Sequence, residues 1–228
     1  TDIVYIETPT NPLMVEFDIA TVAKAAHDKG AKLIVDNTFY SPIYQNPIPL
    51  GADIVVHSAT KYLAGHNDVL AGIVVTNDQA IYDKLFYNLN TTGSTLSPFD
   101  SYLLMRGLKT LKLRMEKATE NARELVTFLK TLPTVKEVLY TGKGGMISFK
   151  VADESKIPTI INRLEVITFA ESLGGVESLI TYPRTQTHAD ILEDVRLSYG
   201  LTNDLLRLSI GIEDVDDLKQ DLKAALGA

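Results

Sequence analysis

IVVHSATKY, at residues 54–62, is the stretch that decides the fold. Its first three residues form a short apolar run, which is typical of a strand buried on both faces. Two hydroxyls, Ser58 and Thr60, and the amine of Lys61 follow directly. In an open α/β sheet, ligands bind just beyond the carboxyl ends of the strands. Two hydroxyls suit a phosphate group, and a lysine held in a dry pocket can act as a Schiff-base nucleophile.

A second buried strand, predicted at residues 32–35, ends in Asp36-Asn37-Thr38. A carboxylate at the end of a buried parallel strand is costly unless a cation meets it. We therefore interpret Asp36 and the Ser-x-Thr-Lys unit as two parts of one site. Pyridoxal phosphate (PLP) would supply a pyridinium cation, a phosphate and an aldehyde for the lysine. An ordinary alternative stays open at this point, in which Asp36 caps a helix and Lys61 is a surface lysine.

The composition is that of a soluble globular protein, since 45% of the 228 residues are hydrophobic and 22% are charged. That length is enough for one large domain or two small ones. The net charge of −7 argues against a nucleic-acid-binding surface. The sequence has no apolar run of about 18 residues and no signal-peptide pattern, so no membrane segment is predicted. Cysteine is absent, which excludes disulfides, zinc thiolates and a cysteine nucleophile.

The first part of the chain alternates strand and helix patterns. Residues 3–6 are predicted to be a buried strand, and two prolines in the loop after it exclude a helix there. A helix is expected between an N-cap at Asp18 and Gly30. Its apolar face consists of Ile19, Val22, Ala23 and Ala26. Because this helix joins two buried strands, the pattern predicts a parallel sheet.

Further elements follow the lysine segment. Residues 70–76 are expected to form a strand, and Asn77-Asp78 to cap a helix that reaches about Asn88. After a loop at 90–98, one long helix is predicted from Pro98 to about Thr131. Its expected buried stripe is Leu103, Leu104, Leu108 and Leu111.

The remainder is predicted to be a smaller α+β domain. Strands are expected at residues 136–140, 145–151, 166–169 and 205–210, and helices at 155–164 and 214–226. The last helix should turn Val215, Leu218 and Leu222 inward.

The histidines near the lysine do not indicate a metal site. His66 and Asp68 lie two residues apart without further ligands, so we interpret them as part of a turn that shapes the pocket, and no metal is predicted. His57 is expected to be a buried histidine with its hydrogen bonds satisfied.

Several motifs, in order along nearly the whole chain, resemble the Cys/Met-metabolism (trans-sulfuration) family of PLP-dependent enzymes. They are Thr8-Pro9-Thr10-Asn11-Pro12-Leu13, Val35-Asp36-Asn37-Thr38-Phe39, His57-Ser58-Ala59-Thr60-Lys61-Tyr62-Leu63-Ala64-Gly65-His66-Asn67-Asp68, Ser97-Pro98-Phe99-Asp100, Arg106-Gly107-Leu108-Lys109-Thr110-Leu111, Glu171-Ser172-Leu173-Gly174-Gly175-Val176-Glu177-Ser178-Leu179 and Leu206-Arg207-Leu208-Ser209-Ile210-Gly211-Ile212-Glu213. Within the family the sequence is most similar to the cystathionine γ-lyases.

The resemblance implies an α/β fold of the PLP-dependent transferase type, that of aspartate aminotransferase (fold type I). A mostly parallel cofactor domain would end near residue 112, inside the long helix, and a smaller α+β substrate-recognition domain would cover residues 113–228. Family chains carry well over a hundred residues before the equivalent of Thr1, so the N-terminal part of the cofactor domain is expected to be missing. The family also implies a cytoplasmic homotetramer built as a dimer of dimers.

The resemblance also assigns roles to individual residues. Lys61 would be the catalytic lysine, and Asp36 would lie under the cofactor ring and keep its nitrogen protonated. Ser58 and Thr60 would anchor the phosphate, and Asn11 would lie near the ring hydroxyl and the substrate carboxylate.

Four residues of the C-terminal domain are expected to bind substrate. Arg207 would hold the α-carboxylate with two parallel hydrogen bonds, with Ser172 nearby. Thr187 is a further family contact, and Glu171 would hold the distal ammonium of cystathionine.

The implied activity is α,γ-elimination of L-cystathionine to L-cysteine, 2-oxobutanoate and ammonia. Cystathionine β-lyase and cystathionine γ-synthase are the alternatives within the family. The alternative that is not an enzyme is a non-catalytic PLP-binding fragment. One departure from the family lies at residues 140–145, where the usual connection is longer by roughly twenty residues. Either the loop is shortened in this protein or a longer loop has been cut out.

Overall fold

The structure is a computed structural model that describes residues 1–227. The chain divides into two compact units. Unit 1 comprises Thr1–Pro9 and Val15–Leu111, and unit 2 comprises Thr10–Met14 and the chain from Lys112 onward. The expected division at residue 112 did not foresee that the short segment Thr10–Met14 would belong with unit 2.

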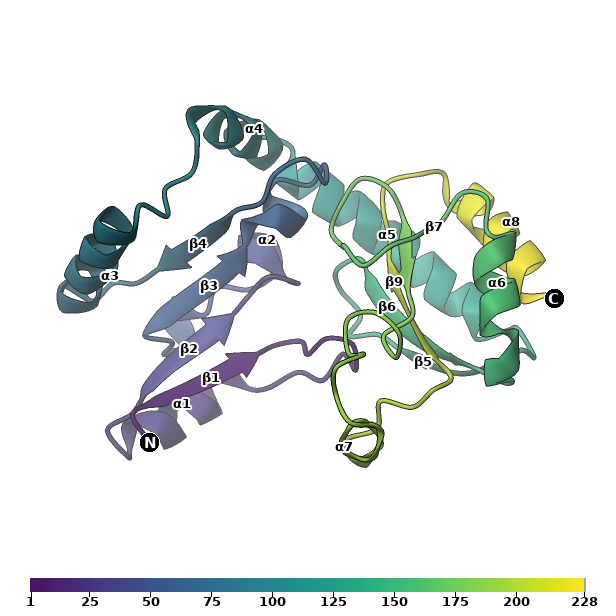
Figure 1. Cartoon of the computed structure of the whole chain (residues 1–228), viewed down its shortest axis with the longest axis horizontal. Helices are drawn as coiled ribbons and strands as arrows, with labels where there is room; N and C mark the ends of the chain where they lie inside the picture. The colour runs from purple at the N-terminus through teal and green to yellow at the C-terminus, as the bar shows by residue number, and fades with distance from the viewer. Residues whose placement is uncertain (228) are drawn as a thin grey trace. The chain divides into compact units, whose positions relative to one another are not determined.

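Unit 1 contains a four-stranded sheet in the order β1-β2-β3-β4 (Figure 1). Its strands are β1 (Ile3–Glu7), β2 (Lys32–Asp36), β3 (Ile54–Ser58) and β4 (Gly72–Val75). The first three strands are parallel, as the strand–helix–strand pattern predicts, and β4 pairs antiparallel with β3. This α/β sheet confirms the predicted fold class for the first unit.

Helix α1 (Ile19–His27) covers one face of this sheet. Its predicted N-cap is confirmed, because the Asp18 carboxylate accepts a hydrogen bond from the Thr21 N–H at 2.7 Å. The apolar face of α1 packs on side chains from all three parallel strands, including Leu33, Val35 and Val55. Since side chains alternate between the faces of a strand, Asp36 and Ser58 project from the opposite face.

The other α-helices of unit 1 are α2 (Ser41–Tyr44), α3 (Gln79–Thr92) and α4 (Pro98–Leu108), and Ile48–Leu50 forms a short 3₁₀ helix. The Asp78 side chain caps α3 by accepting hydrogen bonds from the N–H groups of Ala80 and Ile81. Helix α3 is longer than expected and takes up the start of the predicted 90–98 loop.

The prediction of one long helix from Pro98 to Thr131 is wrong. The segment forms two helices, α4 and α5 (Leu111–Leu129). At the break, Lys109 and Thr110 donate to carbonyls three residues back instead of four, and the Thr110 hydroxyl also donates to the Gly107 carbonyl. Leu108, expected in a buried stripe, is 39% exposed because the helix ends there.

Unit 2 contains a five-stranded sheet in the order β5-β6-β9-β8-β7 (Figure 1). Its strands are β5 (Val135–Leu139), β6 (Met146–Val151), β7 (Thr168–Phe169), β8 (Leu179–Thr181) and β9 (Leu205–Ser209). Its helices are α5, α6 (Ile157–Arg163), α7 (Glu193–Ser198) and α8 (Val215–Leu226). All strand pairs are antiparallel except β7 with β8, as befits an α+β unit.

One hydrophobic core holds unit 2 together. Leu125 and Leu129 of α5 meet Phe149 of β6 in this core. The predicted inward residues Leu218 and Leu222 of α8 are fully buried in it, whereas Val215 is partly buried. Strand β8 and helix α7 were not foreseen from the sequence.

Residues 1–227 contain neither a membrane-spanning helix nor a metal-binding cluster. No helix there combines the length and the apolar character needed to cross a lipid bilayer. No group of three or more His, Cys, Asp or Glu side chains in this range is arranged to hold a metal ion.

Candidate active site

The carboxylate of Asp36 lies at the carboxyl end of β2 and is held from two sides. Its Oδ1 atom accepts the main-chain N–H of Thr38 at 2.9 Å, and its Oδ2 atom accepts the Tyr5 hydroxyl at 3.1 Å. The Thr38 hydroxyl accepts the N–H of Ser58 at 2.8 Å. Thr38 therefore ties the Asp36 carboxylate to the end of β3, the strand that leads to Lys61.

Lys61 lies in a single π-helical turn, Ala59–Leu63, directly after β3. Its backbone leaves the helical region, with φ −88° and ψ −129°, and its carbonyl accepts the N–H of Gly65 at 2.8 Å. Helix α4 packs closely against this turn, because a Cβ atom at Gly107 would lie 2.2 Å from the Ala64 carbonyl oxygen. The close contact with α4 fixes the backbone next to the lysine.

Ser58 and Thr60 line the same cavity, with a volume of about 800 Å³. Hydroxyls from the loop after α3 and from α4 also line it, namely Ser94, Thr95 and Ser101. No acidic side chain is among its lining residues, so the cavity suits an anion such as a phosphate. Sequence reasoning missed the hydroxyls at 94, 95 and 101, although the density of Ser and Thr in the 90–98 loop was a usable signal for the first two.

The hydroxyl of Thr60 is already engaged in unit 1. It donates to the Ala71 carbonyl at 3.2 Å and accepts the Ala71 N–H at 3.0 Å. As a phosphate donor, the Thr60 hydroxyl would have to leave the Ala71 carbonyl. Its role as a phosphate anchor stays a prediction.

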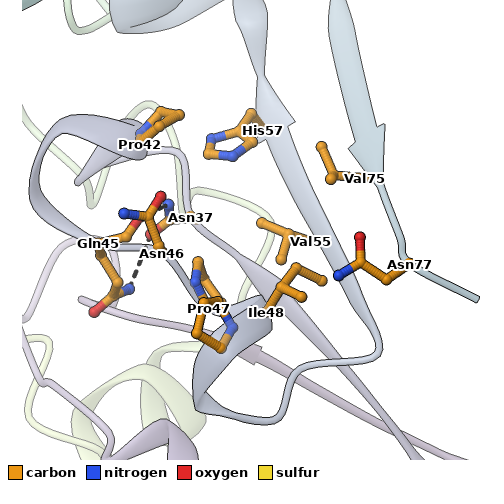
Figure 2. Close-up of a pocket in the computed structure, with 11 residues that line it drawn as sticks. Asn37, Pro42, Gln45, Asn46, Pro47, Ile48, Val55, His57, Val75 and Asn77 are labelled. Atoms are coloured by element: carbon orange, nitrogen blue, oxygen red, sulfur yellow. Dashed lines mark hydrogen bonds between the residues drawn. The ribbon is translucent and has the colours of Figure 1, made fainter.

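His57 lies on the α1 face of the sheet, opposite Asp36 and Ser58. It is buried, and it lines a separate cavity of about 340 Å³ with Asn37, Gln45 and Val55 (Figure 2). Burial lowers the pKa of His57, so the ring is neutral at pH 7. The expectation that its hydrogen bonds are satisfied is wrong, since Nδ1 has no partner in the described structure. The side chain of the fully buried Asn37 bonds to Gln45 and to the Ser41 carbonyl.

Arg207 organises the polar centre of unit 2 and is 1% exposed. Its Nη1 atom donates to the Asn11 side-chain oxygen at 2.9 Å. Its Nη2 atom donates to the Thr181 hydroxyl at 2.9 Å and to the Glu171 carbonyl at 2.8 Å. The structure thus brings together Asn11 and Arg207, which are 196 residues apart, as the resemblance implied.

Glu171 and Ser172 contact Arg207 through their main-chain carbonyls, the latter at 3.3 Å. The substrate contacts expected of their side chains stay predictions. The Thr187 hydroxyl lies 2.8 Å from the His188 ring. The pKa of His188 is lowered by burial and, to a lesser extent, by the positive charge of Arg207.

Sequence reasoning missed Thr181. It is the register partner of Arg207 between β8 and β9, and its hydroxyl donates to the Ala170 carbonyl at 2.7 Å while accepting from Arg207. The apolar pair Leu179-Ile180 was the available signal for this strand, but two residues are too few for a pattern to predict a strand.

The sequence profile of the Cys/Met metabolism PLP-dependent enzymes matches residues 1–227. The chain belongs to this family. Its cofactor is accordingly pyridoxal 5′-phosphate, and the residues present fit that group. A carboxylate at the end of β2 suits the ring nitrogen, a hydroxyl-lined cavity without carboxylates suits the phosphate, and a lysine follows the neighbouring strand.

Two named relatives of the chain are enzymes of cystathionine metabolism. It is 56% identical over 226 residues to a cystathionine γ-synthase/O-acetylhomoserine (thiol)-lyase of Bacillus subtilis, covering 99% of this chain and 61% of that protein. It is 47% identical to a cystathionine γ-lyase of the same organism, covering 99% of this chain and 64% of that protein.

The fold agrees with a solved relative. A cystathionine γ-lyase from Lactobacillus plantarum, complexed with L-serine, matches with a TM-score of 0.94 and 43% identity, covering 99% of this chain and 64% of that one. The chain therefore spans about three-fifths of the length of the proteins it matches.

Proposed function

We propose that the protein is a PLP-dependent carbon–sulfur lyase that acts on a sulfur amino acid. The observation that carries this proposal is the Thr38 bridge, which joins the Asp36 carboxylate to the backbone of Ser58, three residues before Lys61. This is the arrangement that a ring nitrogen, a phosphate and an aldehyde on one cofactor would need.

In this proposal the residues of unit 1 hold the cofactor. Asp36 would hold the ring nitrogen, Ser58 and Thr60 would hold the phosphate, and the Lys61 amine would hold the aldehyde. When bound, pyridoxal phosphate supplies an aldehyde for amines and a ring that withdraws electrons from the substrate α-carbon. Lys61 then takes the proton from the α-carbon and returns it elsewhere, as general base and general acid.

The residues of unit 2 orient the substrate. Arg207 binds the α-carboxylate, with Asn11 and Ser172 beside it, and so helps to select the bond that breaks. Thr187 is a further proposed contact, and Glu171 would pair with the distal ammonium of cystathionine. In α,γ-elimination the Cγ–S bond breaks, and one water is consumed overall to give L-cysteine, 2-oxobutanoate and ammonia.

Cystathionine γ-synthase activity is the second candidate. The 56% identity to a protein with that name favours it, against 47% for a named γ-lyase. In that reaction the cysteine thiol replaces an acyloxy group at the γ-carbon of an acylhomoserine. Cystathionine β-lyase activity remains the third reading within the family. A cytoplasmic homotetramer and a domain boundary near residue 112 are further proposals that rest on the resemblance.

The first experiment is borohydride reduction of the protein at its natural length after incubation with pyridoxal phosphate. A visible absorbance band should disappear and the cofactor should become covalently attached to Lys61, as peptide mass mapping would show. Lys61→Ala should lack both, while Lys109→Ala, at an exposed lysine of the same unit, should retain both. Attachment at another residue, or none in the wild type, would contradict the proposal.

Product analysis separates the candidate reactions. L-Cystathionine should yield 2-oxobutanoate if the protein is a γ-lyase, and pyruvate if it is a β-lyase. Acylhomoserine with L-cysteine should yield cystathionine if it is a γ-synthase. An enzyme that forms cystathionine at least ten times faster than it consumes it would overturn the γ-lyase assignment.

A further inference from the structure

Tyr5 lies on the same face of the sheet as Asp36. In the parallel pair β1–β2, Tyr5 is the register partner of Ile34 and Glu7 is the partner of Asp36. The Tyr5 side chain reaches two residues along the strand direction, and its hydroxyl donates to Asp36 Oδ2 at 3.1 Å. The sequence motifs gave Tyr5 no role.

The two donors to Asp36 come from different elements. The Thr38 N–H fixes Oδ1 from the loop after β2, and the Tyr5 hydroxyl fixes Oδ2 from β1. Together they define the rotation of the carboxylate about its own axis. A carboxylate has about four lone-pair sites, so two donors leave capacity for a third, such as a ring N–H.

The Tyr5 hydroxyl remains a donor throughout the range in which enzymes work. Tyr5 is 57% exposed, and its remaining burial, followed by the negative charge of Asp36, raises its pKa to about 12. The phenol is therefore protonated at neutral and mildly alkaline pH, and the bond to Asp36 persists there.

We propose that Tyr5 is a positioning residue, which orients the Asp36 carboxylate toward the nitrogen of the cofactor ring. This inference rests on the proposed function, because it takes Asp36 as the partner of that nitrogen. Tyr5 itself does not touch the reacting atoms in this proposal. Its effect passes through Asp36 alone, which makes the inference testable by a double-mutant cycle.

The experiment measures the dissociation constant of pyridoxal phosphate by absorbance titration, in the protein at its natural length. Four forms are compared: wild type, Tyr5→Phe, Asp36→Asn and the double variant. Tyr5→Phe should weaken binding about tenfold, because binding must then order an Asp36 carboxylate that Tyr5 no longer holds in place. In the Asp36→Asn background the same change should weaken binding less than twofold. Tyr87→Phe, at a tyrosine of α3 that is 68% exposed, is the matched control and should leave binding unchanged.

The outcomes distinguish this inference from the function on which it rests. If wild type does not bind the cofactor, the proposed function fails together with the inference. If wild type binds it through Lys61 but Tyr5→Phe has the same effect in both backgrounds, or none in either, only the inference is overturned. Thermal unfolding of the cofactor-free variants checks that each is folded at the temperature of the titration.

Discussion

The Nη2 atom of Arg207 donates a hydrogen bond to the Oγ1 atom of Thr181 at 2.9 Å, and both side chains are buried. The same threonine donates to the Ala170 carbonyl, so it satisfies a buried acceptor and orients the guanidinium at once. A small hydroxyl residue that no motif identified thus sets the direction of the proposed carboxylate-binding arginine.

Thr181→Val keeps the side-chain shape and removes both hydrogen bonds. Because it leaves a buried carbonyl and part of a buried guanidinium unsatisfied, we expect a loss of about 1–3 kcal/mol in the free energy of unfolding. Urea denaturation measures this loss. Thr127→Val is the control, since the Thr127 hydroxyl is exposed and only bonds to the Arg123 carbonyl of its own helix. Equal losses in the two variants would contradict the importance of the Arg207 contact.

Arg207→Lys keeps the positive charge and removes the planar fork. An ammonium has three donors and no planar fork, so it cannot reproduce the contacts of Arg207 with Asn11 and Thr181 or bind a carboxylate with two parallel bonds. We expect KM for the amino-acid substrate to rise about tenfold or more, with a smaller change in cofactor affinity. Steady-state kinetics and cofactor titration test this. Arg123→Lys, at an exposed arginine, should change neither, and an unchanged KM in Arg207→Lys would refute the carboxylate role.

Gly107→Ala should disturb the lysine turn. The added Cβ would meet the backbone at Ala64, which cannot move aside like a flexible side chain, and overpacking typically costs about 1–3 kcal/mol. We expect a lower unfolding free energy and lower cofactor occupancy. In Gly72→Ala the new Cβ would find its nearest neighbour, the His57 carbonyl oxygen, at 3.8 Å, so the unfolding free energy of that variant should be close to that of wild type.

Asp53 predicts an acid-dependent stability of unit 1. Burial opposes ionisation, but hydrogen bonds from the Leu33 N–H, His27 and Lys32 outweigh it and lower the pKa of Asp53 to about 2. A carboxyl whose folded pKa lies below its unfolded value of about 4 stabilises the fold above pH 4. That stabilisation should disappear as the pH falls from about 4 to 2. Between pH 4 and 2 the unfolding free energy should depend less on pH in Asp53→Asn than in wild type. An equal pH dependence in the two proteins would contradict the assignment.

Local sequence patterns predicted the parallel strands of unit 1, but they failed where contacts between distant residues determine the structure. The three parallel strands were predictable because each is a short apolar run. Helix α1, which joins the first two, was predictable from its N-cap, Asp18. The break between α4 and α5 was not, because neither Lys109 nor Thr110 is a helix breaker. Just before this break, Gly107 lies close to Ala64, and such a contact between residues far apart in the sequence cannot be predicted from a local pattern.

The candidate site shows the same division. Asp36 and the lysine segment could be associated because parallel strands end at a common edge. Tyr5 and Thr181 could not, since each acts through a neighbouring strand and the register of that pairing is not visible in one sequence. The antiparallel direction of β4 was likewise beyond local pattern, although a strand at that place was foreseen.

The alternation of faces in β3 also limits which length changes this gene can tolerate. Inserting or deleting one residue between Ile54 and Ser58 would move the following side chains to the opposite face of the sheet. The turn that carries Lys61 would then leave the sheet on the wrong side. The connection from Tyr140 to Gly145 lies in the other unit, outside both strand ends. A change of length in that loop therefore leaves the cofactor residues in place, whereas the number of residues from the start of β3 to Lys61 is fixed by the alternation of faces.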